Sequence, residues 1–201
     1  MRVKKALLIV DVQNDFCPGG ALGVKDGDKI IPAINKYIKN FASKKLPIFA
    51  SCDWHPKKTS HFKEFGGIWP KHCIQNTKGA AFHPKLKLPK EAILLYKGMG
   101  PEEDSYSAFH AQGQNGMSFL NLLKILGIEE IYIGGLATDY CVKFSVVDAL
   151  KERFKVKLLV DAIKGVNFKP NDSLDAIREM VRGGVKKITL KRLSKADEKK
   201  S

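Results

Sequence analysis

The sequence predicts a doubly wound α/β fold, in which a single domain contains a mostly parallel six-stranded sheet with helices on both faces. The strand candidates are continuous apolar runs without alternating polarity, which is typical of strands buried on both faces. Segments with helical spacing separate most of these runs, as expected where helices connect parallel strands. The length of 201 residues, with 44% apolar and 28% charged residues, fits one globular domain with a full core.

The N-terminal half supplies two of the strands and one helix. Residues 6–12 form the first continuous apolar run, and residues 47–52 form the second. Between them, Asp28 is predicted to cap a helix. Its inner face is predicted from apolar side chains at helical spacing, namely Ile30, Ile31, Ile34, Tyr37, Ile38 and Phe41.

The C-terminal half continues the alternation after a long loop. Its predicted strands are residues 92–96, 131–135, 155–160 and 185–190. Its predicted helices are residues 117–126, a segment that starts at Cys141, and residues 172–182. Gly127 and the pair Gly183-Gly184 end two of these helices.

The formal net charge of +14 raises the question of nucleic-acid binding. The lysines are scattered over predicted helices and loops, however, and no arginine-rich stripe accompanies them, so no nucleic-acid partner is expected. They cluster in residues 191–201, which we separate as a basic tail from a domain of residues 1–190. No apolar run is long enough for a signal peptide or a membrane span, which predicts a cytoplasmic protein with no membrane partner and four reduced cysteines.

Four predicted strands each end at a residue suited to chemistry. The first ends at Asp11, the second at Asp53, the third at Lys97, and the fourth at the turn that contains Cys141. Ligands of open parallel sheets bind at the carboxyl ends of the strands, so these groups should share one rim. A start of a helix would favour the thiolate of Cys141, although most free cysteines are small buried hydrophobic residues.

Together these groups suggest nucleophilic attack on a carbonyl carbon. Asp11 could remove the thiol proton of Cys141 if burial raises the pKa of its carboxyl group. Lys97 would offset the negative charge of this cluster. Strand-end charges are often only solvated loop residues, but their joint placement beside a cysteine favours a catalytic site.

The loop after the second strand carries candidate metal ligands. Asp53 and His55 are two residues apart and point the same way in an extended chain, and His72 follows further on. One carboxylate with two imidazoles fits a single divalent ion, best zinc, with iron or manganese as alternatives. His61 is a possible fourth ligand.

Two aromatic residues flank these candidate ligands in the sequence. Phe16 follows Asp11 by five positions, and Trp69 precedes His72 by three. They could bracket a flat ring between the metal and the thiol, although core packing is an equal alternative for each.

Five motifs carry a resemblance that covers residues 6–190. They are DVQNDFCPGG from Asp11, DWHP from Asp53, GGIWPKHCIQNTKGAAF from Gly66, YKG from Tyr96 and GLATDYC from Gly135. In order and spacing the chain resembles the nicotinamidases (pyrazinamidases) of the isochorismatase-like cysteine hydrolase family.

The resemblance implies an Asp11–Lys97–Cys141 triad, a metal on Asp53, His55 and His72, and ring contacts from Phe16 and Trp69. It also implies a cis peptide bond between Leu136 and Ala137, with the N–H groups of Ala137 and Cys141 forming an oxyanion hole. Many nicotinamidases carry a small residue in place of His61, whereas the mycobacterial type carries a metal-binding histidine there. The number of ligands and the identity of the metal therefore stay open.

The implied activity is hydrolysis of nicotinamide to nicotinate and ammonia in NAD salvage, with pyrazinamide as a second substrate. Asp11 would activate Cys141, and water would hydrolyse the resulting thioester. The alternative within the enzyme class is a related amidase of the same family that acts on another small amide. A homo-oligomer is also possible.

Overall fold

A seven-stranded sheet forms the centre of the molecule. The computed structural model describes residues 4–103 and 106–193. The sheet order is β4-β3-β2-β1-β5-β6-β7, and every neighbouring pair is parallel except β3 with β4. The strands are β1 (Lys5–Val10), β2 (Ile48–Asp53), β3 (Ile93–Lys97), β4 (Gln112–Gly113), β5 (Glu130–Leu136), β6 (Lys155–Lys164) and β7 (Lys186–Ile188).

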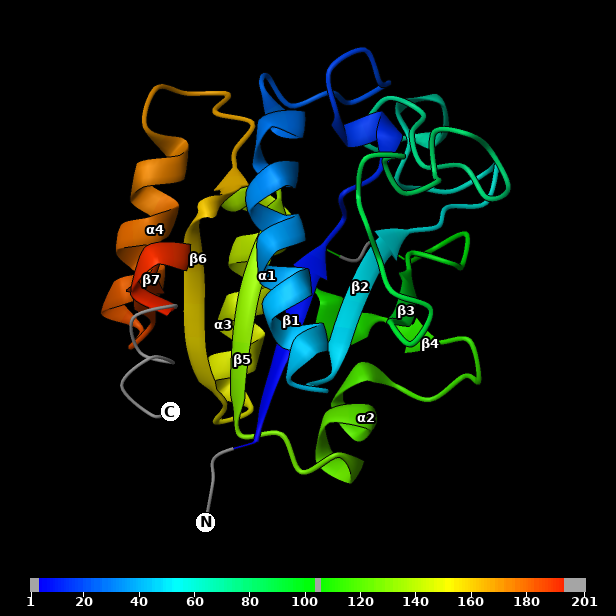
Figure 1. Ribbon diagram of the computed structural model, residues 1–201. Coiled ribbons are helices and arrows are strands. Elements are labelled where there is room, and N and C mark those ends of the chain that lie inside the picture. The colour runs from blue at the N-terminus through cyan, green and yellow to red at the C-terminus, as the bar shows by residue number, and fades with distance from the viewer. Residues whose placement is uncertain (1–3, 104–105, 194–201) are drawn as a thin grey trace.

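Helices cover both faces of the sheet (Figure 1). The helix α1 (Ile31–Ser43) packs on one face, where Leu7 and Ile9 of β1 share a core with its apolar side chains. The helices α2 (Phe119–Ile125), α3 (Lys143–Lys151) and α4 (Asp172–Arg182) contribute to the core on the other face. Alternate residues of β1 therefore serve opposite cores, which explains why this strand is apolar throughout.

Short helical turns connect these elements. They are 3₁₀ helices at η1 (Asn14–Phe16), η2 (Gly27–Ile30), η3 (Lys63–Phe65) and η4 (Ala108–His110), and a π-helical turn at η5 (Thr138–Val142). The long segment between β2 and β3 lies over the carboxyl ends of the strands (Figure 1). It is joined to the β1 end by backbone hydrogen bonds, for example from Asn14 to Ala81 and from Asp15 to Gly79.

The predicted fold class is confirmed, with three corrections of detail. The sheet has seven strands where we predicted six, because the two-residue β4 is too short to leave a periodic signal. The first helix begins at Ile31 with Ile30 as its N-cap residue, so Asp28 lies in the preceding 3₁₀ turn and is not the helix cap. The helix after the fourth parallel strand begins at Lys143, so Cys141 lies in the turn before it.

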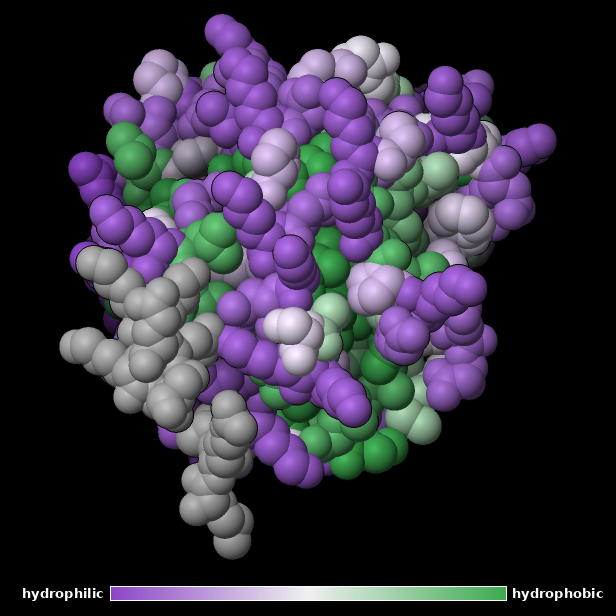
Figure 2. Space-filling view, in the orientation of Figure 1, coloured by the Kyte–Doolittle hydropathy of each residue, from purple (hydrophilic) through white to green (hydrophobic). Residues whose placement is uncertain are grey.

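Hydrophilic side chains dominate the face of the molecule shown in Figure 2, with apolar areas between them. Within residues 4–103 and 106–193, no helix has the length and apolar character needed to cross a bilayer. Of the predicted basic tail, residues 194–201 lie outside the described residues.

Candidate active site

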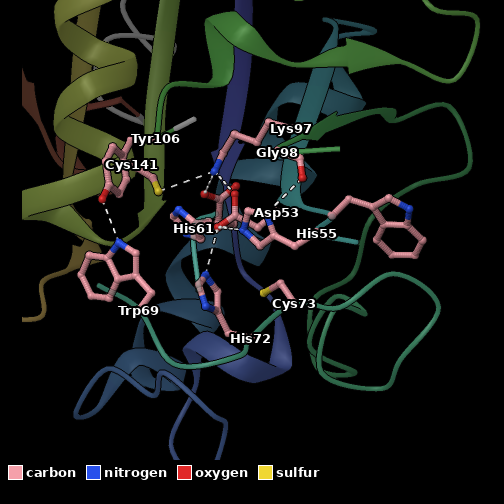
Figure 3. A network of polar contacts seen from close by, with 12 residues as sticks. Asp53, His55, His61, Trp69, His72, Cys73, Lys97, Gly98, Tyr106 and Cys141 are labelled. Atoms are coloured by element: carbon pink, nitrogen blue, oxygen red, sulfur yellow. Dashed lines mark hydrogen bonds and ion pairs between the residues drawn. The ribbon is translucent and has the colours of Figure 1, made fainter. Parts of the chain in front are cut away.

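Three strand ends bring Asp11, Lys97 and Cys141 together. Asp11 directly follows β1, Lys97 is the last residue of β3, and Cys141 lies in the turn after β5. The Nζ of Lys97 lies 2.9 Å from Oδ2 of Asp11. It also lies 3.6 Å from Sγ of Cys141 (Figure 3). The cluster is shielded from solvent, since Asp11, Lys97 and Cys141 are 0%, 1% and 7% exposed.

The register of the sheet fixes the orientation of Asp11. Its neighbour Val10 pairs with Ser51 of β2, so the Ser51 hydroxyl donates a 2.7 Å hydrogen bond to Oδ1 of Asp11. Asp11 itself adopts a left-handed backbone with φ of 48°, which is uncommon for a residue other than glycine. Its carboxylate also shares a hydrogen bond with the thiol of Cys141. Ser51 thus holds one oxygen of the Asp11 carboxylate, and the carboxylate also contacts the Lys97 ammonium and the Cys141 sulfur.

Burial dominates the protonation of this cluster. It raises the pKa of Asp11 and outweighs the Lys97 ammonium, which lowers it. Burial also raises the pKa of the Cys141 thiol well above its usual range, again against the effect of Lys97. Burial would lower the pKa of Lys97, but the carboxylates of Asp11 and Asp53 hold it well above its usual range. The charged ammonium is therefore retained, while the thiol needs a base beside it.

The turn that carries Cys141 differs from a regular helix start. The peptide bond between Leu136 and Ala137 is cis, as the resemblance implied. Tyr140 has non-helical dihedral angles, with φ of −124° and ψ of −109°. The N-cap residue of α3 is Val142, so Cys141 lies one residue before the helix cap. We expected a helix start to favour the thiolate, but burial opposes it.

Asp53, His55 and His72 form a second buried cluster next to the first. Oδ2 of Asp53 lies 3.6 Å from Nε2 of His55 and 3.8 Å from Nε2 of His72. Its other oxygen contacts the ammonium of Lys97, because Asp53 and Lys97 are paired residues of β2 and β3. Burial would raise the pKa of Asp53, but Lys97 and the two imidazoles together hold it well below its usual range.

Two carbonyl groups orient the imidazoles of this cluster. Nδ1 of His55 lies 3.0 Å from the Gly98 carbonyl oxygen, and Nδ1 of His72 lies 2.8 Å from the Pro70 carbonyl oxygen. A carbonyl only accepts, so each Nδ1 donates, and each Nε2 is the ring nitrogen that faces Asp53. Gly98 has φ of +62°, and a Cβ there would overlap the His55 ring, so this position suits only glycine.

The donor set fits a divalent metal ion. Nε2 of His55 is buried and has no hydrogen-bond partner, although such atoms are normally satisfied. His61 is buried beside it, and its ring lies 4.6 Å from that of His55 between centroids. His55, His61 and His72 each place a ring nitrogen within 4.8 Å of the other two. Three imidazoles and one carboxylate are ligands that zinc accepts.

A pocket connects the two clusters. It is lined by Phe16, Leu22, Val24, Asp53, His61, Trp69, His72, Tyr106, Leu136, Ala137, Tyr140, Cys141 and Val166. Phe16 and Trp69 both line this pocket, and both are also largely buried. Each therefore combines the two predicted alternatives, a pocket wall and core packing. The apolar wall, the Cys141 side chain and the imidazoles thus face one space of the kind that holds a small planar molecule.

Residues 5–191 match the isochorismatase domain family. The chain belongs to the isochorismatase family. It is 41% identical to a nicotinamidase from Escherichia coli (strain K12), over 92% of this chain and 95% of that protein.

Two solved structures of the same family are also similar. The pyrazinamidase of Pyrococcus horikoshii in complex with zinc is 44% identical, with a TM-score of 0.85 over 93% of this chain and 99% of that one. PnC1 from L. infantum in complex with nicotinate is 34% identical, with a TM-score of 0.81 over 93% of each chain. The resemblance identified from the sequence is therefore confirmed.

Several residues that shape this isochorismatase-family site were not found from the sequence. Gln13 is fully buried, and its side-chain amide hydrogen-bonds both the N–H and the carbonyl group of Asp53, at 2.9 and 2.8 Å. Asp15 accepts a 2.7 Å hydrogen bond from the N–H of Cys73, which follows His72. Both lie in the quoted motif DVQNDFCPGG, so the motif was the available signal. Their roles depend on partners about 40 to 60 positions away, which no local pattern indicates.

Proposed function

We propose that this protein hydrolyses nicotinamide to nicotinate and ammonia, and pyrazinamide in the same way. One observation carries the proposal, which is the junction of an acid–lysine–cysteine cluster with an Asp–His cluster in a single aromatic pocket. The similarity to the nicotinamidase of E. coli and to a structure in complex with nicotinate supports this substrate class. An attacking thiol, a neighbouring base and a pocket for a flat ring are what hydrolysis of an aromatic carboxamide requires.

In the first half of the proposed reaction, Asp11 takes the proton of the Cys141 thiol as the sulfur bonds to the carboxamide carbon. A base must act during attack, because burial keeps the thiol protonated at rest. Asp11 then gives the proton to the amide nitrogen, the C–N bond breaks, and ammonia leaves a thioester on Cys141. Lys97 remains charged throughout and holds the Asp11 carboxylate in place.

In the second half, Asp11 takes a proton from water while the water oxygen bonds to the thioester carbon. The C–S bond breaks, the proton passes from Asp11 to the sulfur, and the acid is released and loses its remaining proton to solvent as nicotinate. The N–H groups of Ala137 and Cys141 are assigned to the oxyanion of both tetrahedral intermediates. Both residues line the pocket, at the two ends of the turn that follows the cis peptide bond.

In this proposal Asp53, His55 and His72 hold one divalent metal ion, with His61 as a candidate fourth ligand. Zinc suits this donor set best, and iron or manganese are alternatives. When bound, the ion supplies a Lewis acid that can coordinate the ring nitrogen of the substrate. Phe16 and Trp69 contact the faces of the ring. The backbone carbonyl groups of Gly98 and Pro70 keep the imidazoles of His55 and His72 oriented.

The test is release of ammonia by the purified protein from nicotinamide, pyrazinamide and a panel of small aliphatic amides, with metal analysis of the same sample. The proposal predicts efficient release from both ring amides and bound metal near one ion per chain. No release from nicotinamide, with efficient release from another small amide, would instead identify the related amidase of the same family.

A further inference from the structure

Trp69 makes a hydrogen bond that no step of the proposed reaction uses. Its indole N–H donates to the hydroxyl oxygen of Tyr106 at 2.8 Å (Figure 3). Trp69 is only 5% exposed, and a buried indole N–H that lost its acceptor would be costly. The bond therefore favours the indole orientation in which N–H points toward Tyr106.

The backbone alone holds Trp69 less firmly than it holds the catalytic residues. Trp69 lies in the irregular segment between β2 and β3, not in the sheet. Its carbonyl accepts a 2.8 Å hydrogen bond from Lys63, but its N–H reaches the His61 carbonyl only at 3.4 Å. The Trp69 ring also lies 5.2 Å from that of Tyr140, so side-chain contacts, more than the backbone, must fix its plane.

Tyr106 is itself held against α3 and the turn that carries Cys141. Two residues after it, the N–H of Ala108 donates a 2.9 Å hydrogen bond to the buried Ser145 hydroxyl of α3. The Tyr106 ring stacks on Phe144 of α3, with centroids 5.2 Å apart and planes at 21°. It also lies 5.8 Å from the ring of Tyr140, the residue before Cys141.

We propose that Tyr106 is a positioning residue that fixes the plane of Trp69 relative to Cys141. Its ring is anchored on the helix behind the nucleophile, and its hydroxyl holds the indole that forms one wall of the pocket. The substrate consequence rests on the proposed nicotinamide hydrolysis, whereas the orientation of Trp69 does not. A wall that is correctly placed before binding lowers KM without changing the bond-making step.

The kinetic test compares Tyr106→Phe with the parent, each with and without Trp69→Phe. Tyr106→Phe keeps the ring and removes the hydroxyl that accepts the indole N–H. KM for nicotinamide should therefore rise about three- to tenfold, the value of one hydrogen bond, with kcat nearly unchanged. In the Trp69→Phe background the same change should have no further effect. An equal rise of KM in both backgrounds, or none in the parent, would overturn the proposal.

The second measurement needs no turnover. The chain has two tryptophans, so ¹H–¹⁵N spectra of the folded protein contain two indole N–H signals, assigned with Trp54→Phe and Trp69→Phe. Tyr106→Phe should shift the Trp69 signal and speed its exchange with solvent. The matched control is Tyr96→Phe, because the Tyr96 ring lies 5.4 Å from that of Trp54 and should leave the Trp69 signal unchanged.

These two measurements separate failure of the positioning role from failure of the proposed function. An unchanged Trp69 signal in a folded Tyr106→Phe protein would refute the hydrogen bond whatever the substrate is. A shifted signal in a protein that does not hydrolyse nicotinamide would support the positioning role and refute the substrate.

Discussion

The two halves of the site are built in different ways. Asp11 and Lys97, which we propose as catalytic groups, lie at strand ends, where sheet register sets their separation. The imidazoles and Trp69 lie in the irregular segment between β2 and β3, where single hydrogen bonds to carbonyl groups and to Tyr106 orient them. Asp53 belongs to both halves, because it ends β2 and also faces the imidazoles.

In the proposed reaction, this difference separates the groups that carry out the chemistry from the groups that recognise the substrate. Groups that exchange a proton must keep their distances within a few tenths of an ångström, which the buried sheet ensures. Groups that select a ring can lie on a segment free to vary among relatives of one fold. The predictions below test whether the two halves can be damaged independently.

The largest effect is expected at the sheet half. Cys141→Ala, Asp11→Asn and Lys97→Ala should each lower kcat by on the order of 10³-fold or more, because the three act as one unit. For the same reason, the losses should not multiply in double variants. Steady-state ammonia release checks this, with circular dichroism to confirm folding.

Cys17→Ala is the matched control for the cysteine. Cys17 is also buried, and burial raises the pKa of its thiol to about 11, but it lies outside the cluster. The variant should retain most of the parent activity. A Cys17→Ala protein as inactive as Cys141→Ala would contradict the assignment of the nucleophile.

The next largest effect is expected when the substrate ring is changed, which tests the half that carries the imidazoles and Trp69. Pyrazinamide retains a nitrogen where nicotinamide has one, so the two should be hydrolysed with similar kcat/KM. Benzamide lacks that nitrogen and should be worse by roughly 10²- to 10⁴-fold, because a buried polar partner is left unmatched. Equal kcat/KM on benzamide and nicotinamide would show that the Asp–His cluster does not select the ring.

Ligand removal should damage the loop half while the fold persists. His72→Ala or Asp53→Ala should lower metal affinity by at least about 10- to 100-fold, while the sheet keeps its own core. Metal titration and thermal unfolding of the same samples measure both effects. His61→Ala distinguishes three protein ligands from four, since an equally large loss of affinity would require the fourth. A fully active preparation without metal would refute the metal assignment.

The smallest effect is expected at Gln13, whose side chain holds the backbone of Asp53, the residue that belongs to both halves. Gln13→Met leaves the buried N–H and carbonyl groups of Asp53 without partners, so the free energy of unfolding should fall by about 1–3 kcal/mol. Asn35→Leu is the matched control. The Asn35 amide also makes two hydrogen bonds to backbone groups, the carbonyl of Lys85 and the N–H of Lys87, but these bonds are exposed to solvent. Urea unfolding should show the smaller loss for Asn35→Leu.

The sheet half could be predicted largely from the sequence. Apolar runs located the parallel strands, and the rule that ligands bind at their carboxyl ends placed Asp11, Asp53, Lys97 and Cys141 on one rim. The short β4 was missed because two residues carry no period. The start of α3 was placed too early, because the turn around Cys141 has apolar spacing but a non-helical Tyr140.

The loop half could not be predicted by the same reasoning. His55 and His72 were found from residue type and from the family resemblance, but their tautomers depend on the carbonyls of Gly98 and Pro70. Tyr106 was missed altogether, because its contact with Trp69 spans 37 positions of the chain, on either side of β3. Side chains in such segments are placed by tertiary hydrogen bonds, which leave no periodic pattern in the sequence.

The central claim is that Cys141 carries the acyl group of nicotinamide. Acid quenching during turnover, followed by intact-mass measurement and peptide mapping, tests it directly. The account predicts a nicotinoyl adduct on the peptide that contains Cys141, and neither adduct nor ammonia release with Cys141→Ala. An adduct on another residue, or sustained ammonia release by Cys141→Ala, would contradict it.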